Sequence, residues 1–303
     1  MNNNDGLAAR PAPLDDPALP RLLPFTKMQG IGNDYVYVEE FDSPIANPAP
    51  LAVAISDRHF GVGGDGLVLM GKPSDPSKAD FRMRIFNSDG SEAEMCGNAT
   101  RCVGKYLYEK GFAQTEEFRL ETLAGIRIIK LFTDAGKVGK VRVNMGPPKL
   151  VPAQIPMNAQ GESFINQEFA VDGVAYKGTA VSMGNPHIVV PVIGLAQLDL
   201  PRIGPSFEHH ALFPRRVNTE FIEVISDSRI RMRVWERGAG ETLACGTGAC
   251  ATLVACALNG WTQRKAIVEL RGGELEIEWT ADGDVYMSGG AEFVFSGSFI
   301  TRA

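Results

Sequence analysis

The amino-acid sequence predicts an α+β protein made of two similar strand-rich α/β domains, each with a central helix. Three observations support this prediction: a stretch of the chain that occurs twice, many short segments of alternating polar and apolar residues, and two longer segments of helical character. The 303 residues are enough for two domains with sizeable cores. We expect the two halves to be related by a pseudo-two-fold axis.

The repeat becomes visible when the chain is compared with itself at a separation of 149 positions. Residues 82–98, RMRIFNSDGSEAEMCGN, then align without a gap with residues 231–247, RMRVWERGAGETLACGT. Six of these 17 positions are identical, and both copies contain a Cys-Gly pair. A looser match, 152 positions apart, joins GNDYVYV at Gly32 to GNPHIVV at Gly184. Two copies of this size indicate a duplicated domain rather than a solenoid.

Each copy predicts the same local structure in the same order. RMRIF (82–86) and RMRVW (231–235) alternate at period two, as half-buried strands do. A polar loop follows, and then an expected helix over 98–111 or 247–260, each ending in glycine, a residue common just after a helix. Ten further strands are expected at 35–39, 66–70, 126–132, 140–145, 187–193, 219–225, 266–271, 274–279, 284–289 and 292–299.

Composition excludes several classes of function. A net charge of −6 without any basic block argues against a nucleic-acid or anionic-membrane partner. No segment reaches the roughly 18 apolar residues that a transmembrane helix needs. The first 24 residues contain five prolines and no apolar core, so we expect a disordered tail rather than a signal peptide. Five cysteines without an export signal indicate the reducing cytoplasm, and the four histidines lack metal-site spacing, so no metal is expected.

Cys96 and Cys245 directly precede the two expected helices. Free N–H groups and the helix dipole stabilise negative charge at a helix start, which predicts a thiol pKa below the usual value of about 8.5. The same N–H groups can bind a carboxylate, and Gly97 and Gly246 allow it to approach closely. Two thiols on opposite sides of one carbon can remove an α-proton from one face and return a proton to the other. If the two thiols face each other in this way, an oxidant should convert them into a Cys96–Cys245 disulfide. Three further cysteines are expected to be buried packing residues, namely Cys102, Cys250 and Cys256.

Several longer motifs resemble those of the diaminopimelate epimerases, enzymes of bacterial lysine and peptidoglycan synthesis that need no pyridoxal phosphate. The motifs are GIGNDYVYV (30–38), DRHFGVGGDG (57–66), FNSDGSEAEMCGN (86–98), MGNPHIV (183–189), VNTEF (217–221) and ERGAGETLACGTGA (236–249). The resemblance implies conversion of LL-diaminopimelate to the meso form without a cofactor, by a homodimer. It also implies two domains, over 25–145 plus 291–303 and over 146–290, behind a tail at 1–24.

The resemblance also implies a role for each residue that matches the family's motifs. Cys96 and Cys245 become the acid–base pair, and His187 and Glu236 become the polar groups beside the thiols, Glu236 also contacting the substrate. Four residues are implied in binding the reacting carboxylate: Gly97, Asn98, Gly246 and Thr247. Five are implied in recognising the distal amino-acid head: Asn33, Asn87, Asn185, Asn218 and Arg237. A guanidinium can bind a carboxylate through two hydrogen bonds, and asparagine amides can bind both a carboxylate and an ammonium group.

The sequence departs from the family's pattern at a few positions. Ala99 stands where the family often has glycine, and Gln29 replaces a frequent histidine. Gly66 occupies a position where some members place a glutamine that contacts the substrate. The segment from Asp57 to His59 is interpreted as structural or cleft-supporting, and GVGGDG lacks the context of a nucleotide-binding loop.

Two other functions are weighed against the epimerase. Proline and hydroxyproline racemases also use two cysteines, but they need no residues that recognise a distal head group. A non-catalytic binding protein on the same fold would not require both thiols, and this chain has both.

Overall fold

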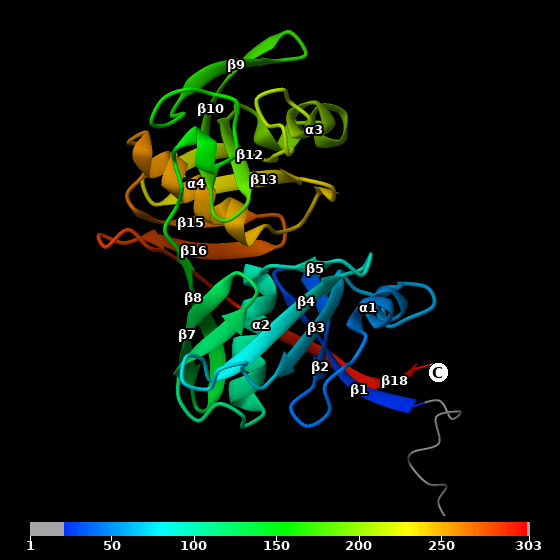
Figure 1. Ribbon diagram of the computed structural model, residues 1–303. Coiled ribbons are helices and arrows are strands. Elements are labelled where there is room, and N and C mark those ends of the chain that lie inside the picture. The colour runs from blue at the N-terminus through cyan, green and yellow to red at the C-terminus, as the bar shows by residue number, and fades with distance from the viewer. Residues whose placement is uncertain (1–20, 302–303) are drawn as a thin grey trace, which may run out of the picture.

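The computed structural model describes residues 21–301, which form two bodies stacked end to end (Figure 1). The first half of the chain contains β1 (Arg21–Gly30), β2 (Asn33–Glu39), α1 (Pro48–Ser56), β3 (Gly66–Gly71), β4 (Phe81–Asn87), β5 (Glu92–Ala93), α2 (Gly97–Glu109), β6 (Glu117–Thr122), β7 (Gly125–Asp134) and β8 (Lys137–Gly146). None of the helices in these residues has the length and apolar character that crossing a bilayer requires.

The second half repeats this series. It contains β9 (Gln167–Val171), β10 (Val174–Ser182), β11 (Pro186–Pro191), α3 (Leu200–Glu208), β12 (Asn218–Ser226), β13 (Arg229–Glu236), β14 (Gly240–Glu241), α4 (Gly246–Leu258), β15 (Lys265–Leu270), β16 (Gly273–Trp279) and β17 (Val285–Gly289), and β18 (Glu292–Thr301) ends the chain. Single 3₁₀ turns lie at Pro152–Gln154 and Leu195–Gln197.

The pairing of the strands is the same in both halves. In the first half β2 and β3 are parallel with α1 between them in the chain, β4 and β6 are parallel with α2 between them, and the remaining neighbours are antiparallel. The strands β10 to β17 repeat this order with α3 and α4. The two central helices both have 13 residues and begin at Gly97 and Gly246, the separation of the sequence repeat. The predicted duplication is therefore confirmed.

The two halves are joined by their equivalent strands. β8 pairs antiparallel with β17, for example Val143 with Met287, which is the relation that a two-fold axis produces. β9 pairs with β10 in the second half, and β18 correspondingly returns to the first half to pair with β1. This arrangement matches the predicted fold class, while the predicted domain boundaries stay a prediction.

The start of β1 corrects the expected length of the N-terminal tail. The strand begins at Arg21, so residues 21–24 are strand residues, and the rest of the predicted tail lies outside the described residues. Residues 21–24 pair with residues 298–301. Local composition could not indicate this pairing, because the partner strand lies at the other end of the chain.

The expected strands and both expected helices are present, but the sequence analysis missed other elements. It did not predict α1 and α3, whose sequences contain several prolines. The prolines at Pro48 and Pro201 lie in the first turn of their helices, where a missing N–H costs little. It also missed β1, β6, β9, β10 and the two-residue strands β5 and β14.

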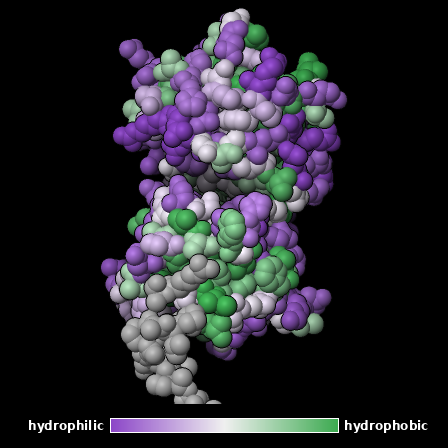
Figure 2. Space-filling model, turned by 90° about the vertical axis from the view of Figure 1, so that its right-hand side faces the viewer, coloured by the Kyte–Doolittle hydropathy of each residue, from purple (hydrophilic) through white to green (hydrophobic). Residues whose placement is uncertain are grey.

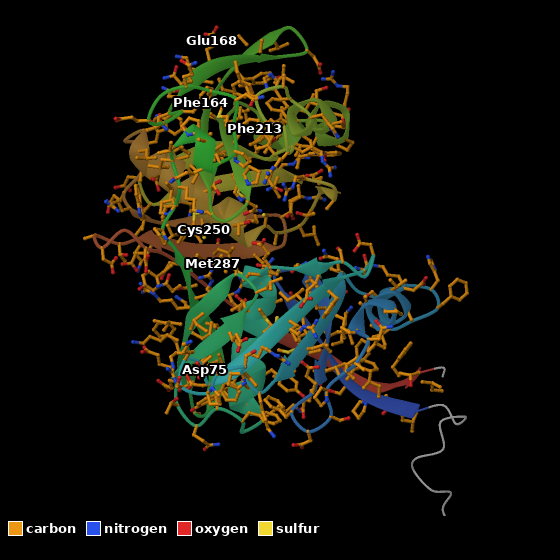
Figure 3. The ribbon with its side chains drawn as sticks, viewed as in Figure 1. Asp75, Phe164, Glu168, Phe213, Cys250 and Met287 are labelled. Carbon is orange, nitrogen blue, oxygen red and sulfur yellow. The ribbon has the colours of Figure 1, made fainter. Side chains whose placement is uncertain are left out.

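The starts of α2 and α4 pack against one side chain, Met287 of β17, which is fully buried. A Cβ atom on Gly97 would lie 2.6 Å from Met287 Cε, and one on Gly246 would lie 2.9 Å from Met287 Sδ. Figure 3 shows Met287 and Cys250 of α4 where the two halves meet. Any side chain at either helix start would therefore force Met287 to shift, so this packing favours glycine at both positions, in addition to the predicted approach of a substrate.

Replacing Met287 with alanine should destabilise the whole fold. The substitution leaves a cavity between the two helix starts, and buried Met-to-Ala changes cost about 2–5 kcal/mol in the free energy of unfolding. Urea denaturation measures this loss. The control is Ile193→Ala, at a fully exposed side chain, which should change the free energy by less than about 0.5 kcal/mol. Equal effects of the two substitutions would contradict the packing described here.

Candidate active site

Cys96 and Cys245 are the N-cap residues of α2 and α4, and their backbones have the same extended conformation. The φ and ψ angles are −133° and 117° at Cys96, and −127° and 109° at Cys245. Cys245 Sγ accepts a hydrogen bond from the Gly248 N–H at 3.4 Å. The Cys96 thiol donates to Asn33 Oδ1 at 3.4 Å, and the nearby N–H groups of Asn98 and Ala99 act to lower its pKa. Both halves therefore place a thiol against the N–H groups of a helix start, as predicted.

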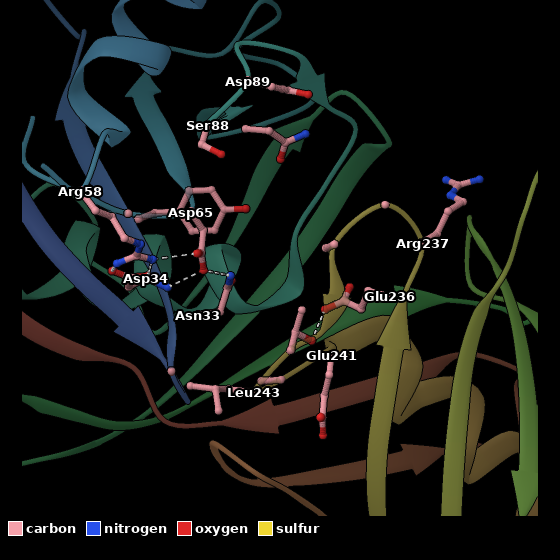
Figure 4. Close-up of a pocket in the computed structure, with 18 residues that line it drawn as sticks. Asn33, Asp34, Arg58, Asp65, Ser88, Asp89, Glu236, Arg237, Glu241 and Leu243 are labelled. Carbon is pink, nitrogen blue, oxygen red and sulfur yellow. Dashed lines mark hydrogen bonds and ion pairs between the residues drawn. The ribbon is translucent and has the colours of Figure 1, made fainter. Parts of the chain in front are cut away.

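A cleft of about 880 Å³ lies between the two halves. Figure 4 shows Asn33, Asp34 and Arg58 on one side and Glu236, Arg237 and Glu241 on the other, and Figure 2 shows the molecule narrowing between its halves. Four of the predicted site residues line the cleft: Asn33, Asn87, Glu236 and Arg237. The cysteines lie beside its lining, because Cys96 contacts Asn33 and Cys245 follows Ala244 in the chain.

In the first half, a network of charged groups orients Asn33. Asn33 Nδ2 donates to Asp65 Oδ2 at 2.6 Å, which leaves Asn33 Oδ1 toward the Cys96 thiol. Arg58 Nη2 pairs with Asp34 at 2.9 Å and with Asp65 at 3.1 Å, and the buried Lys27 pairs with Asp34 at 2.6 Å. Burial and the charge of Asp34 raise the pKa of Asp65. Arg58 thus supports the cleft as expected, whereas the role of Asp65 was missed.

In the second half, a chain of hydrogen bonds leads from the buried pair of His187 and Glu220 to Cys245. His187 Nδ1 lies 2.7 Å from Glu220 Oε1, and both side chains are fully buried. His187 Nε2 lies 2.9 Å from Asn185 Oδ1, and Asn185 Nδ2 donates to Thr247 Oγ1 at 3.3 Å. Thr247 Oγ1 in turn lies 3.5 Å from Cys245 Sγ. His187 therefore reaches the thiol through two intermediate side chains.

The sequence analysis missed Glu220, whose carboxylate lies close to Cys245 beside Gly248. A Cβ atom on Gly248 would lie 2.6 Å from Glu220 Oε1 and 3.2 Å from Cys245 Sγ. Within the described residues Glu220 Oε2 has no hydrogen-bond partner. The only available signal was the position of Glu220 within the VNTEF motif, two residues after the predicted substrate residue Asn218.

Glu236 lies beside the second thiol, as predicted. It accepts a hydrogen bond from Thr242 Oγ1 and interacts with the Cys245 thiol. Burial raises the pKa of Glu236, and these two hydrogen bonds oppose the rise. Glu236 therefore faces both the cleft and Cys245.

Asn218 and Asn98 are both buried, with their side-chain atoms engaged inside the protein. Asn218 Oδ1 accepts the backbone N–H of Arg237 at 2.9 Å, and its Nδ2 donates to Pro186 O at 2.9 Å. Asn98 Nδ2 donates to Ala244 O at 3.4 Å, across the junction of the halves. The structure thus gives Asn218 a part in holding the exposed Arg237. Asn87 lines the cleft and donates to Ser91 Oγ at 3.0 Å.

The predicted lowering of the two thiol pKa values is wrong in this structure. Burial raises the pKa of Cys96 and outweighs the hydrogen bonds from Ala99 and Asn98. Burial also raises the pKa of Cys245 well above its usual value, and the charges of Glu236 and Glu220 raise it further. Helix starts favour a thiolate, but desolvation opposes it more strongly here.

The prediction that the other three cysteines are packing residues is confirmed. Cys102, Cys250 and Cys256 are fully buried. Burial raises their pKa values to about 11, about 12 and about 12, respectively. They are therefore neutral thiols at ordinary pH.

Fold and site together define a duplicated α+β protein in which each half presents one cysteine at the start of its central helix, beside a shared cleft. The chain belongs to the diaminopimelate epimerase family, whose model matches residues 25–151 and 179–294. A diaminopimelate epimerase from Desulfovibrio desulfuricans is 58% identical over 284 residues, covering 91% of this chain and 98% of the relative. One from Methanococcus maripaludis is 52% identical over 274 residues, covering 90% of this chain and 98% of the relative.

Solved structures of more distant proteins share the fold. A hydroxyproline epimerase from Agrobacterium vitis, with bound trans-4-hydroxy-L-proline, has a TM-score of 0.65 at 15% identity and covers 93% of this chain and 92% of its own. A phenazine biosynthesis protein from Bacillus anthracis has a TM-score of 0.63 at 16% identity, covering 93% of this chain and all of its own. These likenesses establish the architecture alone.

Replacing Glu220 with alanine should destabilise the protein strongly. It leaves His187 Nδ1 buried without its partner, and an unsatisfied buried polar group costs about 1–3 kcal/mol. Urea denaturation measures the change in the free energy of unfolding. Asp80→Ala, which removes an exposed pair with Arg119, is the control and should cost less than about 1 kcal/mol. If the two variants unfold at the same urea concentration, the buried pair does not support the second half.

Proposed function

We propose that this protein converts LL-diaminopimelate into meso-diaminopimelate without a cofactor, using Cys96 and Cys245 as an acid–base pair. The observation that supports this most directly is the equivalent placement of the two thiols at the starts of duplicated helices beside one cleft. The identity of 58% to a diaminopimelate epimerase supports the choice of substrate.

In the proposed mechanism, a thiolate on one face removes the α-proton of the substrate, and the thiol on the other face donates its proton to the same carbon. The C–H bond that breaks is replaced by a new C–H bond of opposite configuration, and the two sulfurs exchange protonation states. The α-carboxylate becomes an enediolate as the proton leaves. We assign the stabilisation of that charge to the backbone N–H groups of Gly97, Asn98, Gly246 and Thr247, at the two helix starts.

The distal amino-acid head is assigned to the cleft. Asn33, Asn87 and Arg237 line it, and Arg237 supplies a guanidinium for the distal carboxylate. Asn218 supports Arg237 by accepting its backbone N–H, whereas Asn185 contacts Thr247 on the side of the reacting carboxylate. We assign the carboxylate of Glu236 to an ammonium group of the substrate, beside Cys245.

Closure of the cleft is part of this proposal. Its lining comes from both halves of the chain, so a relative rotation of residues 25–145 plus 291–303 against 146–290 narrows it. Such a closure brings Arg237 to the substrate and excludes water from the thiols.

A homodimer in the cytoplasm completes the proposal. Four apolar side chains of β1 and β18 are exposed and suit a contact with a second copy: Leu22, Val294, Phe295 and Ile300. The family's role in amino-acid biosynthesis and the free cysteines are in keeping with a reducing compartment.

The rival functions have weaker support. Proline and hydroxyproline carry no distal carboxylate, so Arg237 in the cleft has no counterpart in a proline racemase mechanism. A non-catalytic binding protein gives no reason for thiols at both helix starts.

The test is α-proton exchange in D₂O followed by NMR, with purified protein under reducing conditions. LL-diaminopimelate should take up deuterium and yield the meso isomer, whereas L-proline should do neither. Cys96→Ala and Cys245→Ala should each lower the rate at least about 100-fold, because each removes an acid–base group. Exchange into proline but not diaminopimelate would overturn the substrate, and an active Cys96→Ala variant would overturn the mechanism.

Arg237→Lys should weaken substrate binding while the protein stays folded. Lysine cannot form the two parallel hydrogen bonds that a guanidinium offers a carboxylate, so we expect KM to rise about 10-fold, which corresponds to about 1.4 kcal/mol. Steady-state kinetics with LL-diaminopimelate measure this change. The control Arg119→Lys alters an exposed pair with Asp80 and should leave KM unchanged. Native kinetics for Arg237→Lys would show that another residue holds the distal carboxylate.

A further inference from the structure

Glu208, the last residue of α3, is a buried carboxylate that lies outside the lining of the cleft. Its Oε1 accepts the backbone N–H of Gly238 at 2.9 Å and a hydrogen bond from Arg216 Nη1 at 3.1 Å. Its Oε2 accepts a hydrogen bond from Trp235 Nε1 at 2.8 Å. Burial raises the pKa of Glu208, but the hydrogen bonds from Trp235 and Gly238 and smaller charge effects outweigh burial, so the pKa lies below its usual value. Glu208 is therefore an ionised acceptor for three donors.

The segment that Glu208 holds is the loop at residues 237–239, which joins β13 to β14 and lines the cleft (Figure 4). Two consecutive N–H groups of this loop are bound by buried side chains. Asn218 Oδ1 accepts the N–H of Arg237, and Glu208 accepts the next one, of Gly238, both at 2.9 Å. Hydrogen bonds to a charged acceptor are the stronger kind, so Glu208 is the stronger of the two anchors.

The Trp235 indole, which donates to Glu208, contacts both α3 and the end of the loop. A Cβ atom on Gly204 of α3 would lie 2.2 Å from the indole ring, and one on Gly240 would lie 3.5 Å from it. Gly204 therefore lets the ring pack directly on the helix, and the ring supports the first residue after the loop. The hydrogen bond to Glu208 holds the ring in this place. The helix, the ring and the loop thus form one packed unit.

Arg216 connects the same carboxylate to the side chain of Arg237. The backbone of Arg216 has a φ of 61°, in the left-handed region that favours glycine, so an arginine there carries a conformational cost. The hydrogen bond from its guanidinium to Glu208 opposes that cost. The carbonyl oxygen of the preceding residue, Arg215, accepts a hydrogen bond from Arg237 Nη1 at 3.2 Å. Glu208 therefore holds both the backbone of the loop and the turn that receives the Arg237 side chain.

The first half has no such anchor at the matching positions. The helices α1 and α3 both have nine residues, and Ser56 ends α1 where Glu208 ends α3. At the separation of 149 positions, Phe86 aligns with Trp235, and phenylalanine has no N–H to donate. The carboxylate and its indole partner therefore belong to the half whose loop carries Arg237. This difference indicates a role for Glu208 beyond the packing that both halves need.

We propose that Glu208 is a positioning residue that fixes the loop of Arg237 to α3 and thereby sets the affinity for the distal carboxylate of the substrate. The part that concerns affinity rests on the proposed function, in which Arg237 binds that carboxylate. A loop that is already ordered loses less conformational entropy when the substrate binds. Because Arg237 is assigned to the distal head rather than to the thiols, weakening the anchor should raise KM and leave kcat nearly unchanged.

The test compares Glu208→Gln with Glu223→Gln in the full chain. Glutamine keeps the size of glutamate, but its NH₂ group cannot accept, so at least one of the donors around Glu208 loses its partner. Glu223 is a matched control, because its carboxylate also binds loop N–H groups, those of Gly194 and Leu195, at 2.9 and 3.0 Å. It also pairs with an arginine, Arg231, and lies outside the cleft lining. Circular dichroism checks that both variants fold.

The first measurement needs no substrate. Hydrogen–deuterium exchange with mass spectrometry follows the peptide that contains residues 237–239. Glu208→Gln should increase the exchange rate of this peptide about 10-fold, because a hydrogen bond to a charged acceptor is lost. Glu223→Gln should leave the rate unchanged. An unchanged rate in folded Glu208→Gln would overturn the anchoring of the loop.

The second measurement is steady-state kinetics with LL-diaminopimelate. We expect Glu208→Gln to raise KM about 5-fold with kcat within about 2-fold of the wild type, and Glu223→Gln to change neither. Faster loop exchange with an unchanged KM would overturn the link to substrate affinity. An equal rise of KM in the two variants would overturn it as well.

Trp235→Phe replaces Glu208→Gln if the latter does not fold. It removes one donor and keeps an aromatic ring, so loop exchange and KM should rise by smaller factors, and no change in either would overturn the proposal. The exchange measurement does not depend on turnover. Faster exchange in a protein that does not convert LL-diaminopimelate would therefore reject the substrate and keep the anchor. Turnover of LL-diaminopimelate with unchanged exchange in Glu208→Gln would reject this inference alone.

Discussion

The structure depends on one packing constraint, the meeting of two helix starts against Met287. A side chain at Gly97 or Gly246 would force Met287 to shift, so glycine at both positions lets the two helix starts pack closely against it. The same approach brings two N-capping thiols to the border of one cleft. It also buries them, which opposes the ionisation that a base requires. The charges of Glu236 and Glu220 oppose the ionisation of Cys245 further.

Duplication supplies the scaffold, and substitution has made its halves chemically different. Asn33 and Asn185 occupy equivalent positions and both act near a thiol. Tyr35, however, is the equivalent of His187, and each lies in the same register of a parallel strand pair, opposite Gly66 or Asn218. The space at Gly66 is closed by the Tyr35 ring and Phe86 O, so the first half cannot hold a side chain where the second half holds Asn218. A symmetric scaffold thus carries an asymmetric site. Such a site suits a reaction in which different groups act on the two faces of one carbon.

Sequence reasoning predicted the parts of this structure that are local or repeated. The alternation in RMRIF and RMRVW and the glycine ends of the helices identified β4, β13, α2 and α4. The grouping of residues 291–303 with the first half came from the family resemblance alone, because the pairing of β18 with β1 depends on contacts between segments far apart in the chain. Three other features depend on tertiary burial and were also beyond prediction. They are the inward orientation of Asn218, the position of Glu220 near Cys245 and the raised thiol pKa values. The position of a thiol at a helix start accounts for only one influence on its pKa, and desolvation is another.

The central claim is that Cys96 and Cys245 act from one shared space. Oxidation with diamide, followed by peptide mapping under non-reducing conditions, tests it most directly. The account predicts one new disulfide, between Cys96 and Cys245, that forms as proton exchange is lost and is reversed with activity by dithiothreitol. It also predicts that Cys102, Cys250 and Cys256 stay reduced. Loss of activity with both Cys96 and Cys245 still free would contradict it, and so would a disulfide that joins either one to a different cysteine.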